Sequence, residues 1–159
     1  MTNVKFHFVV SKSAIEKTVE FLKISEKKQT EVVILWSGKI KGNTVRITTA
    51  WLPIQYSDVG FFMIPGDELF KLNRTIFESG ERLVAQVHTH PTLAFHSDAD
   101  SEYSVTSMEN GLSIVIPNFG ATSITSYKEC AYFIHQGGQW IRLSHVDARL
   151  YIMYEENFH

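Results

Sequence analysis

The chain has 159 residues, the usual size of one domain, and 44% of them are hydrophobic, enough to form a buried core. Fifteen basic and seventeen acidic residues give a net charge of −2, without the clustered basic excess that is typical of nucleic-acid or membrane-surface binding. The single cysteine, Cys130, excludes an intrachain disulfide and a metal site built from several thiolates.

The N-terminal residues MTNVKFHFVV contain neither a long apolar segment nor a small-residue cleavage site, so no signal peptide is expected. No apolar run elsewhere approaches the roughly 20 residues that a membrane span needs. We therefore expect a soluble, cytoplasmic protein with neither a membrane nor a nucleic acid as a partner.

Short runs rich in β-branched and aromatic residues alternate along the chain with segments of helical periodicity. Gly and Asn turn signals separate several of them. In chain order, the sequence predicts a strand at Val4–Val10, a helix at Ser11–Lys28, a strand at Glu31–Ile40 with a hairpin partner at Thr44–Ile54, a loop or short strand at Gln55–Ile64, a helix at Gly66–Gly80, a strand at Arg82–His90, a helix from Ser97 to about Met108, a strand at Gly111–Gly120, a hairpin of Glu129–His135 with Gln139–Ser144, and a closing helix at Val146–Glu156.

Strands interspersed with helices, several of them joined by hairpins, indicate a mixed sheet with helices packed on it, an α+β architecture. Without an internal repeat or a linker, we expect residues 1–159 to form a single domain. On the first two helices the apolar residues share one face, which we expect to point inward: Ile15, Val19 and Leu22 on one, and Leu69, Leu72, Ile76 and Phe77 on the other.

Three of the seven histidines lie in the stretch QVHTHPTLAFHSDADSEYSV, which follows the third strong strand. On a strand, side chains two residues apart point the same way, so His88 and His90 share one face about 7 Å apart along the backbone. Thr89 faces the opposite side. Two imidazoles at that spacing can converge on one metal ion, and Pro91 ends the strand so that both lie at its mouth. A His-x-His pair by itself is as consistent with surface or hydrogen-bonded histidines.

A carboxylate that could complete the site comes ten residues after the second histidine. Ser97 suits the N-cap of a helix, and Asp100 would be the third helical residue, facing back toward the start of the helix. In isolation these two residues are equally a capping box. Two histidines and one aspartate leave a fourth tetrahedral position for water, as in catalytic zinc sites, where zinc lowers the pKa of its water to about 7.

The combination of HTHP with SDAD resembles the His-x-His-Pro…Ser-x-x-Asp signature of JAMM (JAB/MPN) zinc isopeptidases, in particular their prokaryotic branch. That family also has a glutamate at the start of an apolar strand that ends in glycine seven residues later, and EVVILWSG, from Glu31 to Gly38, matches it. The resemblance spans roughly Glu31 to Gly120. It implies a single-domain, cytidine-deaminase-like JAB/MPN fold with a mixed, mostly antiparallel sheet flanked by helices.

The resemblance also implies a role for each matching residue. His88, His90 and Asp100 would bind one Zn2+ per chain, Glu31 would act as general base and later as general acid, and Ser97 would donate a hydrogen bond to the developing oxyanion. One feature departs from the family: His90 and Asp100 enclose nine residues, one fewer than usual, although Ser97 and Asp100 keep their mutual spacing.

Several neighbouring residues have competing interpretations. Asp98 is a rival metal ligand, but as the first helical residue it would face solvent. His96 could crowd the site, and an exposed loop histidine is the simpler interpretation. Cys130 precedes an alternating aromatic strand and is expected in the core. Phe61 and Phe62 could belong to the core or line a substrate groove.

Compact members of the family resemble peptidases that cut after the C-terminal glycine of a ubiquitin-like protein, beside activating and conjugating enzymes of the same bacterial conjugation or antiphage operons. The resemblance therefore implies a ubiquitin-like protein or its conjugates as partners, in deconjugation or maturation. Two alternatives remain open: a non-catalytic MPN-type interaction module, and a hydrolase acting on the tail of a sulfur-carrier protein or on a small amide.

Overall fold

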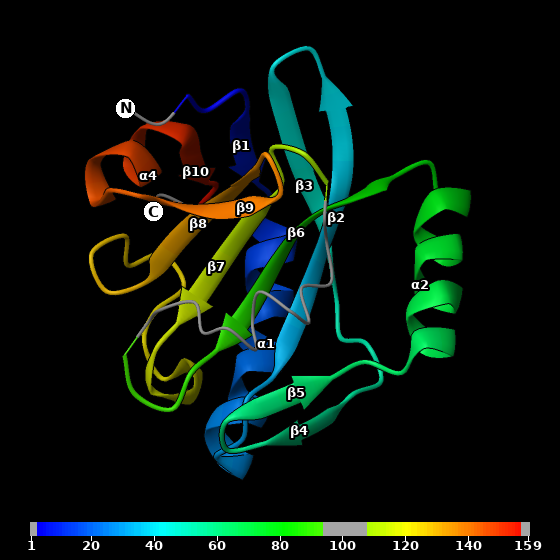
Figure 1. Cartoon of the computed structure of the whole chain (residues 1–159), viewed down its shortest axis with the longest axis vertical. Coiled ribbons are helices and arrows are strands. Elements are labelled where there is room, and N and C mark those ends of the chain that lie inside the picture. The colour runs from blue at the N-terminus through cyan, green and yellow to red at the C-terminus, as the bar shows by residue number, and fades with distance from the viewer. Residues whose placement is uncertain (1–2, 94–107, 157–159) are drawn as a thin grey trace.

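The computed structural model describes residues 3–93 and 108–156, and within them a mixed sheet curls through the centre of the molecule (Figure 1). The β-strands of this sheet are, in spatial order, β10 (Ile152–Tyr154), β1 (His7–Val10), β3 (Thr44–Trp51), β2 (Val33–Lys41), β6 (Arg82–Thr89), β7 (Leu112–Ile116), β8 (Ala131–Gln136) and β9 (Gln139–Leu143). A separate hairpin consists of β4 (Tyr56–Asp58) and β5 (Phe61–Met63).

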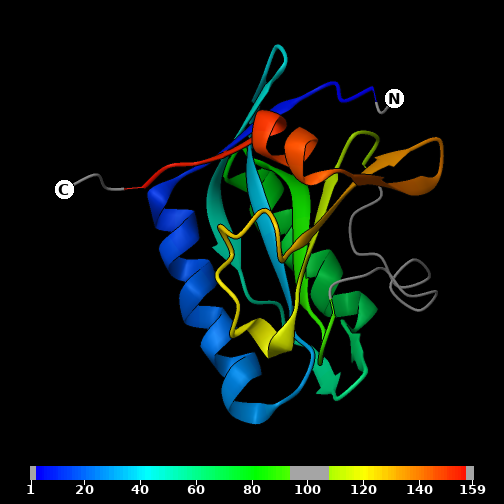
Figure 2. The same ribbon diagram turned by 90° about the vertical axis from the view of Figure 1, so that its left-hand side faces the viewer.

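Helices cover both faces of the sheet, and Figure 2 shows α1 (Lys12–Lys28) and α2 (Gly66–Glu78) on opposite sides of it. A short helix, α4 (His145–Tyr151), precedes β10, and a 3-10 turn, η1 (Asn118–Gly120), follows β7. Four of the seven strand pairings in the large sheet are antiparallel: β2 with β3, β2 with β6, β7 with β8, and β8 with β9. The predicted α+β fold with a mixed, mostly antiparallel sheet is confirmed.

The strand β2 is buried on both faces from Val33 to Gly38, the apolar part of its sequence. Ile34 and Trp36 join the large core cluster beneath α1, whereas Val33 and Leu35 form a second cluster with Phe62 beneath α2. Successive side chains of a strand alternate between its faces. The sheet therefore has an α1 face, which carries the main core, and an α2 face with a smaller one.

The inward faces of the helices differ in part from the sequence prediction. Val19 is 40% exposed and Phe77 is 79% exposed, whereas Leu22 and Ile76 are buried as expected. On α1 the buried line includes a polar residue, Thr18, because its hydroxyl accepts a 2.8 Å hydrogen bond from the indole nitrogen of Trp36 and donates to a backbone carbonyl. A satisfied polar group can be buried at little cost, so periodicity of apolar residues alone misplaced the face.

The closing segment is also shorter as a helix than predicted. The prediction of one helix over Val146–Glu156 is wrong beyond Tyr151, because the next three residues form β10 and pair in parallel with β1. The predicted strand Gly111–Gly120 likewise ends at Ile116, before Pro117. The helix predicted from Ser97 lies almost wholly outside the described residues. Among the helices of the described ranges, none is long and apolar enough to cross a membrane.

Gly38 is required where β2 changes register against β3. The pairing shifts between Ser37 and Gly38, and a Cβ atom built on Gly38 would lie 1.8 Å from the carbonyl oxygen of Arg46. That contact involves backbone on both sides and cannot be relieved by rotating a side chain. Gly38 thus allows β3 to approach β2 closely, and β2 in turn positions the residues described below.

We expect Gly38→Ala to lower the free energy of unfolding by about 2–3 kcal/mol, since the added methyl group forces two central strands apart. Chemical denaturation would measure it. Gly66→Ala is the matched control: its Cβ would meet no atom within 4 Å, so a change of at most about 0.5 kcal/mol is expected. Equal stability of the two variants would contradict this account.

Candidate metal centre

The two histidines of the HTHP motif lie at the end of β6, in the middle of the sheet. His88 is 0% exposed and His90 is 3% exposed, because β6 runs between β2 and β7. Both backbone polar groups of His90 are hydrogen-bonded. Its N–H donates to the carbonyl of Ile116 at 2.9 Å, and its carbonyl accepts from the N–H of Phe119 at 2.8 Å. The strand end is therefore held rigidly where the motif begins to leave the sheet.

The imidazoles of His88 and His90 lie side by side on one face, as the sequence predicts. Their ring centroids are 5.1 Å apart and the ring planes are inclined by 51°. In the antiparallel register of β2 and β6, His88 is opposite Val33. Residues directly opposite each other point to the same face, so both imidazoles are on the α2 face with Val33.

Thr89 points the other way and serves the fold. Its hydroxyl lies 2.8 Å from the hydroxyl of Ser25 on α1 and accepts a 3.0 Å hydrogen bond from the N–H of Val32. Its own N–H donates to the carbonyl of Val32 at 3.1 Å. The residue between the two imidazoles thus ties β6 to both α1 and the start of β2.

Glu31 is buried, with 4% of its surface exposed, immediately before β2. The Thr89–Val32 hydrogen bond continues the register of β2 and β6 beyond Val33, and one further step sets Glu31 across from His90. Its backbone N–H donates to the carbonyl of Asp58 in β4 at 2.8 Å. Since side chains alternate along a strand, we expect a carboxylate two residues before Val33 on the α2 face, the face of the two imidazoles.

An aromatic ring covers part of this site. Phe62 is 5% exposed, and its ring centroid lies 5.5 Å from that of His88. It packs with Val33 and Leu35 and so belongs to the wall of the site as well as to the smaller core. For Phe61, the structure describes only the backbone, which pairs with Asp58 in the β4–β5 hairpin.

The other predicted site residues lie outside the described ranges. Ser97 and Asp100 fall there, together with the competing residues His96 and Asp98. Within residues 3–93 and 108–156, no group of three metal-binding side chains occurs. The described part of the site accordingly provides two imidazoles as candidate ligands, and the third ligand that the sequence predicts stays a prediction.

Two buried polar residues next to the histidines escaped the sequence analysis. Gln86 lies two residues before His88, on the same face, and its amide donates to the hydroxyl of Ser113 at 3.2 Å. Both are 0% exposed. The available signal was a glutamine inside an otherwise apolar strand, because an amide buried at such a place needs a partner.

Fold and site together define an α+β protein with a buried pair of imidazoles at the centre of its sheet and a buried glutamate just before the neighbouring strand. No family model matches the chain. It is, however, 32% identical over 114 residues to the probable metalloprotease y4jG of Sinorhizobium fredii (strain NBRC 101917 / NGR234), and the alignment covers 69% of this chain and 70% of that protein. The chain therefore belongs to the metalloprotease family of that protein, a class of peptidases that depend on a metal ion.

Solved structures show the same fold in another protein. The solution structure of protein DSY2949 from Desulfitobacterium hafniense superposes with a TM-score of 0.66 and covers 94% of both chains. The sequence identity is 14%, so this similarity concerns the fold alone.

Cys130 takes no part in the site. It is 1% exposed and belongs to the core cluster on the α1 face, away from the imidazoles, so the prediction of a core residue is confirmed. Burial, with a smaller contribution from the nearby Glu129 carboxylate, raises the pKa of the Cys130 thiol to about 12. A thiol with so high a pKa carries almost no thiolate at neutral pH and is a poor nucleophile.

We expect wild-type protein to bind one equivalent of a divalent metal, and His88→Ala to weaken binding by at least about a hundredfold, since even outer-shell partners account for 10–100-fold. Elemental analysis after dialysis against a weak chelator measures the bound metal. His145→Ala, which removes an exposed histidine of α4, is the control and should keep the metal. Full metal content in His88→Ala would exclude this histidine as a ligand.

We expect Cys130 to resist iodoacetamide in the folded protein at pH 8.5 and to react completely in denaturant, as mass spectrometry would show. The raised pKa means that the folded state holds this proton more tightly than the unfolded state, whose thiol titrates near 9.0. The contribution of Cys130 to stability should therefore decline as the pH rises above 9 toward 12. Rapid labelling of the native protein would contradict the buried position.

Proposed function

We propose that this protein is a JAMM-type zinc isopeptidase, one JAB/MPN domain over residues 1–159, that cleaves after the C-terminal glycine of ubiquitin-like modifiers. The observation that carries the proposal is the buried pair of imidazoles, His88 and His90, side by side on the α2 face, and the burial of Glu31 just before β2 supports it. Two metal-binding imidazoles and a carboxylate that can move a proton are the functional groups that amide hydrolysis with a metal requires.

The spacing of the imidazoles supports zinc. Two histidines bound to one tetrahedral zinc at about 2.0–2.1 Å have ring centres about 5 Å apart, because each ring centre lies about 1 Å beyond its nitrogen. The centroids of His88 and His90 are 5.1 Å apart without any rearrangement. Asp100, the third residue of the signature, would complete the set of protein ligands.

Zinc bound there would supply a Lewis acid that polarises the scissile carbonyl and makes water more acidic. Glu31 accepts a proton from the attacking water on a carboxylate oxygen, and Ser97 donates a hydrogen bond to the carbonyl oxygen as negative charge develops. When the C–N bond breaks, Glu31 returns its proton to the departing lysine amine. The burial of Glu31 suits this role, because proton transfer in a site shielded from bulk water is not diverted to solvent.

The substrate class follows from the resemblance and is supported by the wall of the site. Phe62 packs against His88, so one side of the approach to the metal ligands is lined by an aromatic ring. A tail that ends in glycine can pass such a ring more closely than a tail with bulky side chains. Activating and conjugating enzymes from the same operon, as in conjugation or antiphage systems, would supply the conjugates that this enzyme cleaves.

We expect Glu31→Gln to retain bound zinc and to lose cleavage of a modifier–lysine conjugate by at least about a thousandfold, because glutamine cannot accept the proton. Single-turnover cleavage and elemental analysis would be measured on the same sample. Glu26→Gln, at an exposed position of α1, should cleave as wild type does. Undiminished cleavage by Glu31→Gln would refute the mechanism, and a wild type that binds no metal would favour a non-catalytic interaction module.

A further inference from the structure

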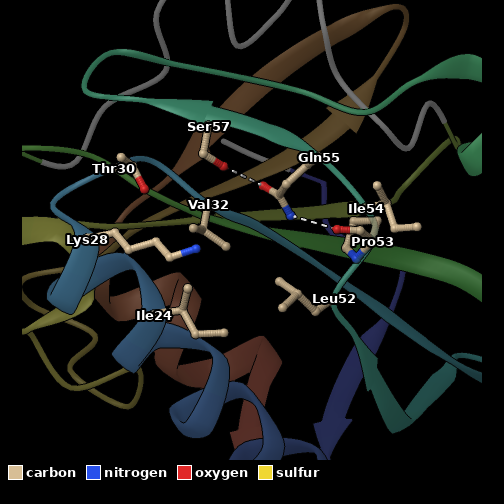
Figure 3. A pocket seen from close by; sticks show the side chains of 9 residues that line it. All are labelled: Ile24, Lys28, Thr30, Val32, Leu52, Pro53, Ile54, Gln55 and Ser57. Atoms are coloured by element: carbon tan, nitrogen blue, oxygen red, sulfur yellow. Dashed lines mark hydrogen bonds between the residues drawn. The ribbon is translucent and has the colours of Figure 1, made fainter.

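The side chain of Gln55 pairs with the backbone of β2 as a neighbouring strand would. Its Oε1 accepts a hydrogen bond from the N–H of Val33, and its Nε2 donates to the carbonyl of Val33, both at 2.9 Å. The amide is itself oriented by neighbours drawn in Figure 3: Nε2 also donates to the carbonyl of Pro53 at 3.1 Å, and Oε1 accepts from the hydroxyl of Ser57.

This pairing occurs where the sheet would otherwise leave an open edge. The last pair between β2 and β3 is Leu35 with Trp51, and the chain then turns away through Pro53. The carbonyl of Val32 points toward β6, so the backbone groups of Val33 point toward the place that β3 has left. Gln55 fills that place with one donor and one acceptor.

Hydrogen bonds from several elements hold the backbone around Glu31. Apart from the bonds of Val32 to Thr89, its outer side is held by Gln55 at Val33 and by Asp58, whose carbonyl accepts from the N–H of Glu31. Behind this segment lies a cavity of about 400 Å³, lined by Thr30 and Val32 among others (Figure 3). Val32 and Val33 pack into the two cores, and the hydrogen bonds of Gln55 and Asp58 fix the backbone on the side that β3 leaves open.

We infer that Gln55 is a positioning residue for Glu31: its two hydrogen bonds to Val33 hold the start of β2, two residues after Glu31. The inference rests on the proposed function, since it assigns Gln55 to the same proton transfer. Gln55 acts through the backbone of Val33. Loss of its pairing should therefore reduce kcat and leave both KM and the zinc content unchanged.

Gln55→Glu tests this role through pH. An ionised carboxylate can accept from the N–H of Val33 but cannot donate to its carbonyl, whereas a protonated one can do both. We expect Gln55→Ala to lower kcat roughly tenfold to a hundredfold at every pH. The kcat of Gln55→Glu relative to wild type should rise as the pH falls from about 7 toward about 4.3, the ordinary pKa of a glutamate. Gln139→Glu, an exposed position in β9, is the matched control with a ratio independent of pH.

Two further measurements test the role of Gln55 independently of the cleavage assay. In Gln55→Ala the amide of Val33 should exchange its hydrogen faster, and the 13C chemical shift of the Glu31 carboxyl carbon should differ from wild type at the same pH. In Gln55→Glu that shift should return toward the wild-type value at low pH. A wild type that cleaves no conjugate would refute the proposed function, yet these shifts would still decide the role of Gln55. An unchanged Glu31 shift in Gln55→Ala, or a flat pH ratio for Gln55→Glu in an active enzyme, would overturn the inference.

Discussion

The antiparallel pairing of β2 with β6 is the constraint on which the candidate site depends. It fixes Val33 opposite His88, and every other relation in the site follows from this register. Because side chains alternate along a strand, a slip of one residue would send Glu31 or both imidazoles to the α1 face. The apolar side chains of β2 prevent such a slip, since they fill different cores on the two faces and cannot exchange places without leaving both badly packed.

Hydrogen bonds on the α1 face hold in place the strands that carry the candidate site on the α2 face. Thr89 joins α1 to β2 through its hydroxyl, and Thr18 joins α1 to Trp36 of β2. Both are polar residues in a largely apolar core, and both have hydrogen-bond partners, so their burial carries no large penalty. Such bonds are directional, which means that they fix the distance and angle of the helix relative to the strands, whereas apolar contacts alone would tolerate small shifts.

The sequence predicted most of the strands and the pairing of the two histidines, because both rest on the period-two alternation of a strand. The assignment of Glu31 as general base stays a prediction, and the structure shows this residue buried just before β2. What the sequence analysis missed depends on contacts distant in sequence. β10 forms because Ile152 meets Phe8 of β1, and Thr18 is buried because Trp36 needs an acceptor. The sequence did not point to Gln55, because a side chain that pairs with the backbone of a strand leaves no periodic pattern in the sequence.

The parallel pairing of β1 with β10 has a consequence for biogenesis. β1 lies between β3 and β10, so one of its edges stays unpaired until β10 is made, and β10 is synthesised after all the other strands of the sheet. A nascent chain that still lacks them exposes an unprotected strand edge, which is the kind of surface that recruits other chains. Folding of this sheet therefore finishes only after β10 has left the ribosome.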